Sequence, residues 1–421
     1  MQREGAAVLV VTRFPFVYPG RRAAERYRRR LYLREELDGV TVLRLRIAGE
    51  RVIERVLDRI MRLYARLRAR RQAPLLGKEL IELLYGLLAL PLIAALRPRA
   101  VVVEQGPVWL GLPLWSVARV GVALVLQVSD VKSLALARGR YGGAAAARID
   151  LNRRLENFLY RRAAAIVTVT DALRAHIAAR LGQAEATLHL IPNGAEVDIV
   201  ERLDARERQR CKRRLDLTGK FVVLYAGTFG VAHDLHTVLE AARRLREIPD
   251  LAFLFIGEGP VEQELVQSAA RWGLGNVTFR RGVSLTELAP VLGAADAGVS
   301  PEISGLRDTV RAKIYLYMAA RLPVVVTDDD GEGRALINRA QAGYLVPPGD
   351  AAAMAARLLE LKRQPRMAAL LGENGRRFVE RHHARSELAQ HFARVVLDRT
   401  MAAADAPKAE CPSPIVQREH A

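Results

Sequence analysis

The sequence is poor in cysteine, with only Cys211 and Cys411 among its 421 residues. Two thiols cannot supply the four ligands of a structural zinc site, and so sparse a pair gives no disulfide framework. We therefore expect a protein of a reducing compartment. The N-terminus also shows no signal-peptide pattern, because the apolar run at residues 6–12 is too short for a secretory core, so we expect a cytoplasmic location.

Acidic residues are also scarce, since 46 Asp and Glu stand against 65 Lys and Arg, for a formal charge of +19. This surplus favours an anionic partner, which could be a nucleotide, a phospholipid surface or a nucleic acid. No zinc pattern, RNA-binding aromatic motif or helix-turn-helix signature accompanies the charge, so we expect no nucleic-acid partner. For most single arginines, a solvated surface position is the simpler interpretation.

What the sequence has in abundance is apolar residues, which make up 50% of the chain and allow two sizeable cores. They form short continuous runs typical of parallel strands buried on both faces, with helical patterns between them. This alternation predicts an α/β fold with two similar doubly wound sheets. The runs are residues 6–12, 100–103, 122–128, 166–170, 221–226, 251–256 and 324–327.

Charged residues replace the apolar pattern around residues 201–219, which we interpret as a linker between two domains. The expected N-terminal domain is residues 1–200 and the expected C-terminal domain is residues 220–380. A C-terminal helix follows over residues 381–400. Beyond it, residues 401–421 turn to alanine, proline and charge, which predicts a disordered tail.

Residues 51–96 depart from the alternation. Apolar and arginine side chains over residues 51–67 follow helical spacing on two different faces, which predicts a basic amphipathic helix. Residues 80–96 are nearly all apolar but contain Glu82 and Pro91, which suits a bilayer span poorly. One interpretation is a helix pair lying on anionic lipid, and the other is two ordinary surface helices.

The most informative motif is the glycine turn Gly227-Thr-Phe-Gly230 between the strand at 221–226 and a helical pattern at 237–246. Such a turn lets backbone amides approach an anion, and the helix N-terminus adds positive charge. The strand at 251–256 ends in a second glycine turn at Gly257, again at a carboxyl edge, where doubly wound sheets bind ligands.

The order of these motifs, followed by Lys313-Ile-Tyr-Leu-Tyr-Met-Ala319 and Gly343-Tyr-Leu-Val-Pro-Pro-Gly-Asp350, resembles retaining glycosyltransferases of family 4. The resemblance is close over residues 220–394. It is looser over the N-terminal half, where residues 14–20 form the first glycine loop. Within that family, the chain looks most like bacterial enzymes of cell-envelope polysaccharide and glycolipid assembly.

This resemblance implies a GT-B fold, in which two Rossmann-like domains face a cleft. The second domain would hold a nucleotide-diphosphate sugar, and the first a polysaccharide or lipid-linked acceptor. Transfer would proceed with retention and without a metal or cofactor, because amides and basic side chains stabilise the leaving diphosphate. The enzyme could be peripheral on the inner face of the membrane.

Carried onto this sequence, the resemblance makes Asp130 and Asp308 the candidate catalytic carboxylates. The donor would be bound by the two glycine turns and by three charged side chains, and Gly20 would lie on the acceptor side. The candidate donor-binding residues are Gly227, Thr228, Gly230, Gly257, Arg311, Lys313 and Glu332.

Three positions depart from the family pattern. Leu316 replaces the second glutamate, which binds the ribose hydroxyls, so that either Glu302 or Glu332 substitutes for it or nucleotide binding is weakened. Ser129 and His233 replace a histidine and a lysine that meet the donor. The alternative to an active transferase is therefore a catalytically silent scaffold of the same fold.

Overall fold

The computed structural model describes residues 7–13, 32–37, 40–45, 56, 59–60, 77–104, 108–137, 146–182, 187–198, 204–305 and 308–405. Three expectations lie wholly or largely outside these residues: the glycine loop at Gly20, the basic helix over 51–67, and the disordered tail over 401–421. The tail prediction is wrong for residues 401–405, which are helical. Within the basic helix, Val56, Arg59 and Ile60 are helical and exposed.

A six-stranded parallel sheet forms the core of the second half, in the order β10-β9-β8-β11-β12-β13. The predicted strands at 221–226, 251–256 and 324–327 are confirmed at those bounds. Each is an unbroken apolar run because helices cover both faces of the sheet. The strands are β8 Phe221–Ala226, β9 Leu251–Ile256, β10 Val277–Arg280, β11 Ala297–Ser300, β12 Val324–Thr327 and β13 Gly343–Val346.

Successive residues of β8 point into two separate apolar clusters, one on each face of this sheet. Leu224 packs in one cluster and Val223 in the other, both at most 1% exposed. The sheet is therefore doubly wound, as the sequence predicted. Its helices are α9 Leu235–Arg244, α10 Glu262–Arg271, α11 Leu285–Ala294, α12 Ala312–Ala319, α13 Glu332–Ala340 and α14 Ala351–Arg363.

The first half contains two sheets instead of the single sheet that the sequence led us to expect. One is parallel, in the order β4-β5-β6-β7, and the other has the order β1-β3-β2. In the smaller sheet β2 and β3 are antiparallel, with Leu37 opposite Val40. The strands are β1 Leu9–Arg13, β2 Tyr32–Leu37, β3 Val40–Leu45, β4 Ala100–Glu104, β5 Ala123–Val128, β6 Ala165–Thr168 and β7 Leu188–Leu190.

Strand β1 differs from the buried strand predicted at residues 6–12. Its apolar residues Leu9, Val10 and Val11 are 37%, 39% and 41% exposed. Among the described strands, β1 pairs with β3 alone, so one of its edges carries no neighbour. The apolar run therefore predicted the strand correctly and its burial wrongly.

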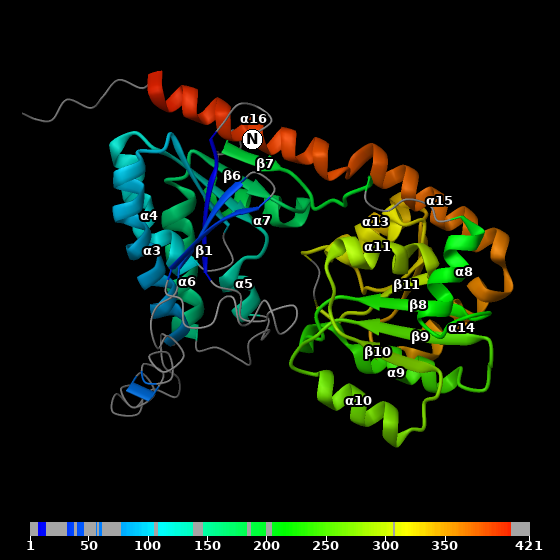
Figure 1. Ribbon diagram of the computed structural model, residues 1–421. Helices are drawn as coiled ribbons and strands as arrows, with labels where there is room; N and C mark the ends of the chain where they lie inside the picture. Colours follow the sequence, from blue (N-terminus) through cyan, green and yellow to red (C-terminus); the bar gives the residue numbers. More distant parts are fainter. Residues whose placement is uncertain are drawn as a thin grey trace, which may run out of the picture.

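Helices cover the four-stranded sheet on one side, and the C-terminal helix covers the other. Val395 and Val396 of α16 Arg385–Asp405 pack with Val125 of β5 and Val167 of β6. Figure 1 shows α15 Pro365–His382 and α16 running in succession along both halves. The remaining helices of the first half are α3 Gly77–Leu96, α4 Val108–Leu114, η2 Trp115–Val120, α5 Lys132–Ala137, α6 Ala146–Tyr160 and α7 Asp171–Leu181.

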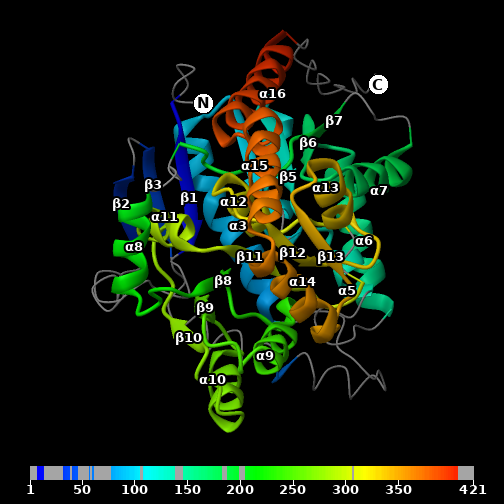
Figure 2. The same cartoon turned by 90° about the vertical axis from the view of Figure 1, so that its right-hand side faces the viewer.

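The segment expected as a linker contains helix α8 Ala205–Arg214. Asp204 and Glu207 form a capping box at its N-terminus, which is why a charged stretch begins a helix here. Arg208 and Lys212 then bind Asp296, at 2.6 and 2.7 Å, and attach α8 to the second half. Figure 2 accordingly shows α8 beside α11.

Candidate functional site

Strand β8 ends in the glycine turn that the sequence singled out. Gly227 has a φ of +147°, which favours glycine, and its amide donates to the Ile256 carbonyl at 2.9 Å. The Phe229 amide donates to the Glu258 carbonyl at 2.9 Å. In the described chain, the amides of Thr228 and Gly230 have no main-chain acceptor. Two amides of the turn are therefore available to a ligand.

Gly257 lets a second turn pack closely against this one, because glycine has no side chain. A methyl group on Gly257 would lie 1.9 Å from the Gly227 carbonyl oxygen, and one on Gly259 would lie 2.4 Å from that of Phe229. The two glycine turns can pack against each other only because both positions are bare. The structure thus gives Gly257 a spacing role in shaping the site.

Lys313 lies directly beneath the first turn. Its Nζ atom is 3.8 Å from the centre of the Tyr225 ring, and a methyl group on Gly227 would lie 3.1 Å from it. The residue is half-buried, but Nζ itself is shielded from solvent and has no hydrogen-bond partner in the described chain. A shielded ammonium without an anionic partner is costly, and an incoming anion would relieve that cost.

The electrostatics of Lys313 follow from this position. Burial first, and the Arg311 guanidinium second, lower the pKa of the Lys313 ammonium to about 7, against a smaller opposing effect of Glu302. His233, in the short helix η4 Val231–His233 after the turn, is affected similarly. Burial, then Lys313 and Arg311, lower the pKa of His233 to about 3, so its imidazole is neutral near pH 7.

The Arg311 side chain forms an ion pair with a carboxylate. Its Nε atom donates to Glu302 Oε1 at 2.5 Å. Burial raises the pKa of Glu302, while Arg311 opposes that rise. Thr327 of β12 fixes the Glu302 backbone by donating to its carbonyl and accepting from its amide, at 3.0 and 2.5 Å. Of the two possible substitutes for the missing glutamate, Glu302 is therefore already paired.

Asp308 and Glu332 lie where the two halves meet. The Asp308 carbonyl accepts from Thr170 Oγ1 at 2.6 Å, and Glu332 Oε1 accepts from the Ala172 amide at 2.6 Å. Thr170 and Ala172 stand at the N-terminus of α7 in the first half. The two predicted residues thus join the halves, and Glu332 also acts on Tyr315 of α12, because its charge adds to burial in raising the Tyr315 pKa.

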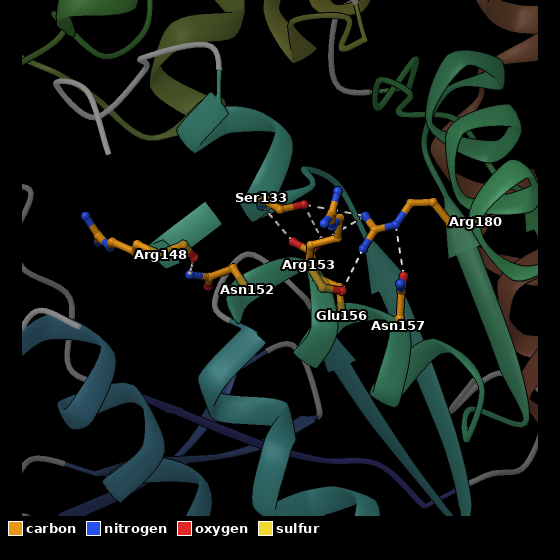
Figure 3. Close-up of polar contacts among 7 residues, drawn as sticks. All are labelled: Ser133, Arg148, Asn152, Arg153, Glu156, Asn157 and Arg180. Carbon is orange, nitrogen blue, oxygen red and sulfur yellow. Dashed lines mark hydrogen bonds and ion pairs between the residues drawn. The ribbon is translucent and has the colours of Figure 1, made fainter. Parts of the chain in front are cut away.

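Asp130 lies two residues after the end of β5, at the carboxyl edge of the first half's parallel sheet. Its segment is attached to a buried polar network that the sequence did not reveal (Figure 3). Glu156 of α6 accepts from the Ser133 amide and hydroxyl at 2.8 and 2.5 Å, and from Arg180 Nη1 at 2.8 Å. Glu156 is 0% exposed, so all these bonds are shielded from water.

The structure therefore brings together part of the predicted site. Gly227 and Lys313 meet, with His233 close by, while Arg311 is paired with Glu302. Tyr225 and Tyr317, which sequence reasoning missed, support the turn from below. Tyr225 donates to the Thr228 carbonyl, and Tyr317 accepts from the Ala226 amide, both at 2.7 Å. Both tyrosines stand within apolar runs, where their hydroxyl groups gave no separate signal.

Two α/β halves, joined near α7 and bound together by a C-terminal helix that returns to the first half, define the GT-B class. Solved structures share this fold. Sucrose-phosphate synthase from Thermosynechococcus elongatus matches with a TM-score of 0.69 at 18% identity, over 96% of this chain and 91% of that one. Anabaena Alr3699/HepE, in complex with UDP and glucose, matches with a TM-score of 0.62 at 17% identity, over 73% and 80%.

Sequence comparison gives the family. Residues 1–194 match the family "Glycosyl transferase 4-like domain", and residues 220–364 match "Glycosyl transferases group 1". The chain belongs to the group 1 glycosyltransferases.

Curated relatives match part of their length. EpsD of Bacillus subtilis is 27% identical over 53% of this chain and 58% of its own length. The O-antigen chain mannosyltransferase C of Escherichia coli is 28% identical over 45% and 49%. The 2-deoxystreptamine glucosyltransferase of Streptomyces kanamyceticus is 27% identical over 58% and 63%. The chain thus spans about half to two thirds of these relatives.

Proposed function

We propose that this protein transfers a sugar, with retention, from a nucleotide-diphosphate sugar to a cell-envelope polysaccharide or lipid-linked acceptor. The observation that carries the proposal is the shielded, unpartnered Lys313 ammonium beneath the Gly227 turn. A diphosphate placed there would receive one cation and the free amides of the turn. The same groups would stabilise the charge that develops on the departing diphosphate.

Further residues receive proposed roles around this centre. Thr228 and Gly230 would donate their amides to phosphate oxygens, and Arg311 would add a second positive charge. Asp308 and Asp130 remain the proposed carboxylates that face the sugar and the acceptor. Glu332 is the proposed hydrogen-bond acceptor for the ribose hydroxyl groups. To bind them it would give up its bond with the Ala172 amide.

Relatives support this choice of substrates. Alr3699/HepE was solved with UDP and glucose and with UDP-glucose, which supports a nucleotide sugar as the donor. Relatives named for O-antigen and phosphatidylinositol mannoside mannosyl transfer support an envelope acceptor. An acceptor of this kind would place the enzyme at the inner face of the membrane.

Calorimetric titration with the diphosphates of uridine, guanosine and thymidine tests the donor half of the proposal. We expect binding of at least one of them, and then hydrolysis or transfer of the matching nucleotide sugar, with product anomers assigned by NMR. Absence of binding by all three at millimolar concentration would overturn the proposal. An inverted product would refute retention alone.

A second function, a catalytically silent scaffold, is favoured by one observation. Leu316 is partly buried against the apolar cluster that contains Leu224, so it serves packing where the family has a ribose-binding glutamate. The variant Leu316→Glu separates the two functions. Tighter nucleotide binding without turnover would support the scaffold, whereas turnover by the unaltered protein would exclude it.

A further inference from the structure

Helix α3 has an unusual distribution of polarity. Among the described helices, its segment Glu79–Leu96 is the one that is long and apolar enough to cross a membrane, yet only 28% of it is buried. In Figure 1, α3 lies on the side of the first half that faces away from the six-stranded sheet. Ile81 and Tyr85 belong to the core, but the exposed apolar residues of α3 are not explained by a place in it.

The face of α3 that points into the protein carries its acids. Glu79 is 0% exposed, and its Oε1 accepts from Arg148 Nε and Nη2 at 3.1 and 2.9 Å. Glu82 is 4% exposed. Gly86 lies on the same face, where a methyl group would meet the Leu110 carbonyl of α4 at 2.4 Å. Close packing on α4 and the buried ion pair together hold α3 against the domain.

The opposite face of α3 is an apolar surface, which we call the α3 outer face. Leu84, Leu87 and Leu88 are 39%, 47% and 52% exposed, and Leu96 is 54% exposed. Pro91 is also exposed, and this spacing places Leu84, Leu87, Leu88 and Pro91 along one side of the helix, while Leu96 lies at its C-terminal end. A surface helix normally exposes its acids, whereas α3 buries Glu79 and Glu82 and exposes these leucines.

Basic residues border this face where α3 ends. The chain enters β4, β5 and β6 through residues 97–99, 118–122 and 161–164, which contain arginines and no acidic residue. These segments lie side by side, because the Ala123 amide donates to the Arg99 carbonyl at 3.0 Å and the Ala164 amide donates to the Leu124 carbonyl at 2.8 Å. Arg97, Arg99, Arg161 and Arg162 are all exposed.

We propose that the α3 outer face lies flat on an anionic phospholipid bilayer, with these arginines bound to headgroup phosphates. Leucines on one side of a helix with adjoining basic residues are what an interfacial helix requires. Crossing the bilayer would instead remove Glu79 from Arg148 and place a carboxylate in hydrocarbon. The helix therefore stays docked on its domain and inserts its outer side chains.

This inference deepens the proposed function, since it brings the first half to the surface where a lipid-linked acceptor would be found. Binding to lipid does not itself depend on nucleotide binding or turnover. The two proposals can consequently fail separately, and the experiment measures both.

The test is co-sedimentation of the full chain with vesicles of phosphatidylcholine, with and without phosphatidylglycerol, over a range of salt concentrations. We expect binding that requires phosphatidylglycerol and weakens with salt. The triple variant Leu84→Gln/Leu87→Gln/Leu88→Gln should lower the partition coefficient at least about tenfold. Arg97→Gln/Arg99→Gln should lower it by a smaller factor and reduce the salt dependence.

The second half offers matched controls. Val266, Met367 and Leu370 are 42%, 40% and 51% exposed, so their triple replacement by glutamine removes similar apolar surface elsewhere. Arg363→Gln/Arg366→Gln matches the arginine pair, because both residues are exposed. Neither control should change partition. If the partition coefficient falls equally in the test and control variants, the proposal is wrong.

Two further outcomes distinguish lipid binding from self-association and from the proposed function. If the unaltered protein ignores anionic vesicles, and light scattering shows that the leucine variant converts a dimer into a monomer, the α3 outer face is a self-association surface and the proposal is wrong. Titration of each variant with uridine diphosphate is the separate measurement. Vesicle binding without nucleotide binding would leave this inference standing and remove the proposed function.

Discussion

Each half of the chain shields a charged side chain at the carboxyl edge of its parallel sheet, but only one of them has partners. Glu156 accepts three hydrogen bonds from Ser133 and Arg180. Lys313 has no hydrogen-bond partner in the described chain and rests on the Tyr225 ring. A buried charge with its partners in place organises a fold, whereas one without them is prepared for a ligand.

We expect the largest effect, a loss of stability, when Glu156 is replaced. Glu156→Gln leaves Arg180 shielded without its counter-charge, which should lower the free energy of unfolding by about 3 kcal/mol. Urea denaturation measures this loss. The control is Glu247→Gln, whose side chain is 85% exposed and should change stability by less than about 0.5 kcal/mol. A loss at Glu156 as small as the control's would show that the network is dispensable.

Lys313 should show the opposite behaviour. Lys313→Met removes an unpaired charge but keeps the length of the side chain, so the melting temperature should stay level or rise. Affinity for the nucleoside diphosphate should fall about 10- to 100-fold, because charge-assisted bonds to phosphate are lost. Calorimetry and thermal melts of the same sample give both values. Lys362→Met, which breaks a surface pair with Asp250, is the control for affinity.

The pH dependence follows from the lowered pKa of Lys313, about 7 in the folded protein against 10.5 in the unfolded chain. Between these values the unfolded chain binds more protons, so stability should rise with pH across that window. In the same range, nucleotide binding should require proton uptake and weaken by up to about tenfold per pH unit. Titrations in buffers of different ionisation enthalpy measure the uptake, and Lys313→Met should abolish it.

Glu332 is the intermediate case, a charged group with one partner across the two halves. Glu332→Gln keeps an oxygen that can accept from the Ala172 amide. We expect nucleotide affinity to fall by less than about threefold, because a neutral acceptor can replace the charge at a ribose hydroxyl. Competition binding with uridine diphosphate measures this change. A fall of tenfold or more would mean that the charge itself is needed by the ligand.

The sequence predicted the second half better than the first, for physical reasons. Strands such as β8 and β9 are buried on both faces, and continuous apolar runs identify them directly. Strands β2 and β3, which pair antiparallel, were missed because each mixes polar with apolar residues and so forms no continuous apolar run. Helix α8 was missed because almost every residue in it is polar.

The candidate site was predictable only in part. Motif order identified the Gly227 turn and Lys313, but not that the Lys313 ammonium lies shielded beneath the turn, because that depends on how α12 packs on β8. The Glu156 network joins residues 23 and 24 positions apart through side chains, which no local spacing shows. Likewise, the bond between Glu332 and Ala172 spans 160 positions and exists only once both halves are docked.

The return of α16 to the first half has a consequence for synthesis on the ribosome. Val395 and Val396 complete the packing around β5 and β6, but they are made after the whole second half. One face of the four-stranded sheet must therefore stay uncovered until α16 has been made. The first half is therefore synthesised first but its packing is completed last. A truncation ahead of α16 would leave one face of its sheet uncovered.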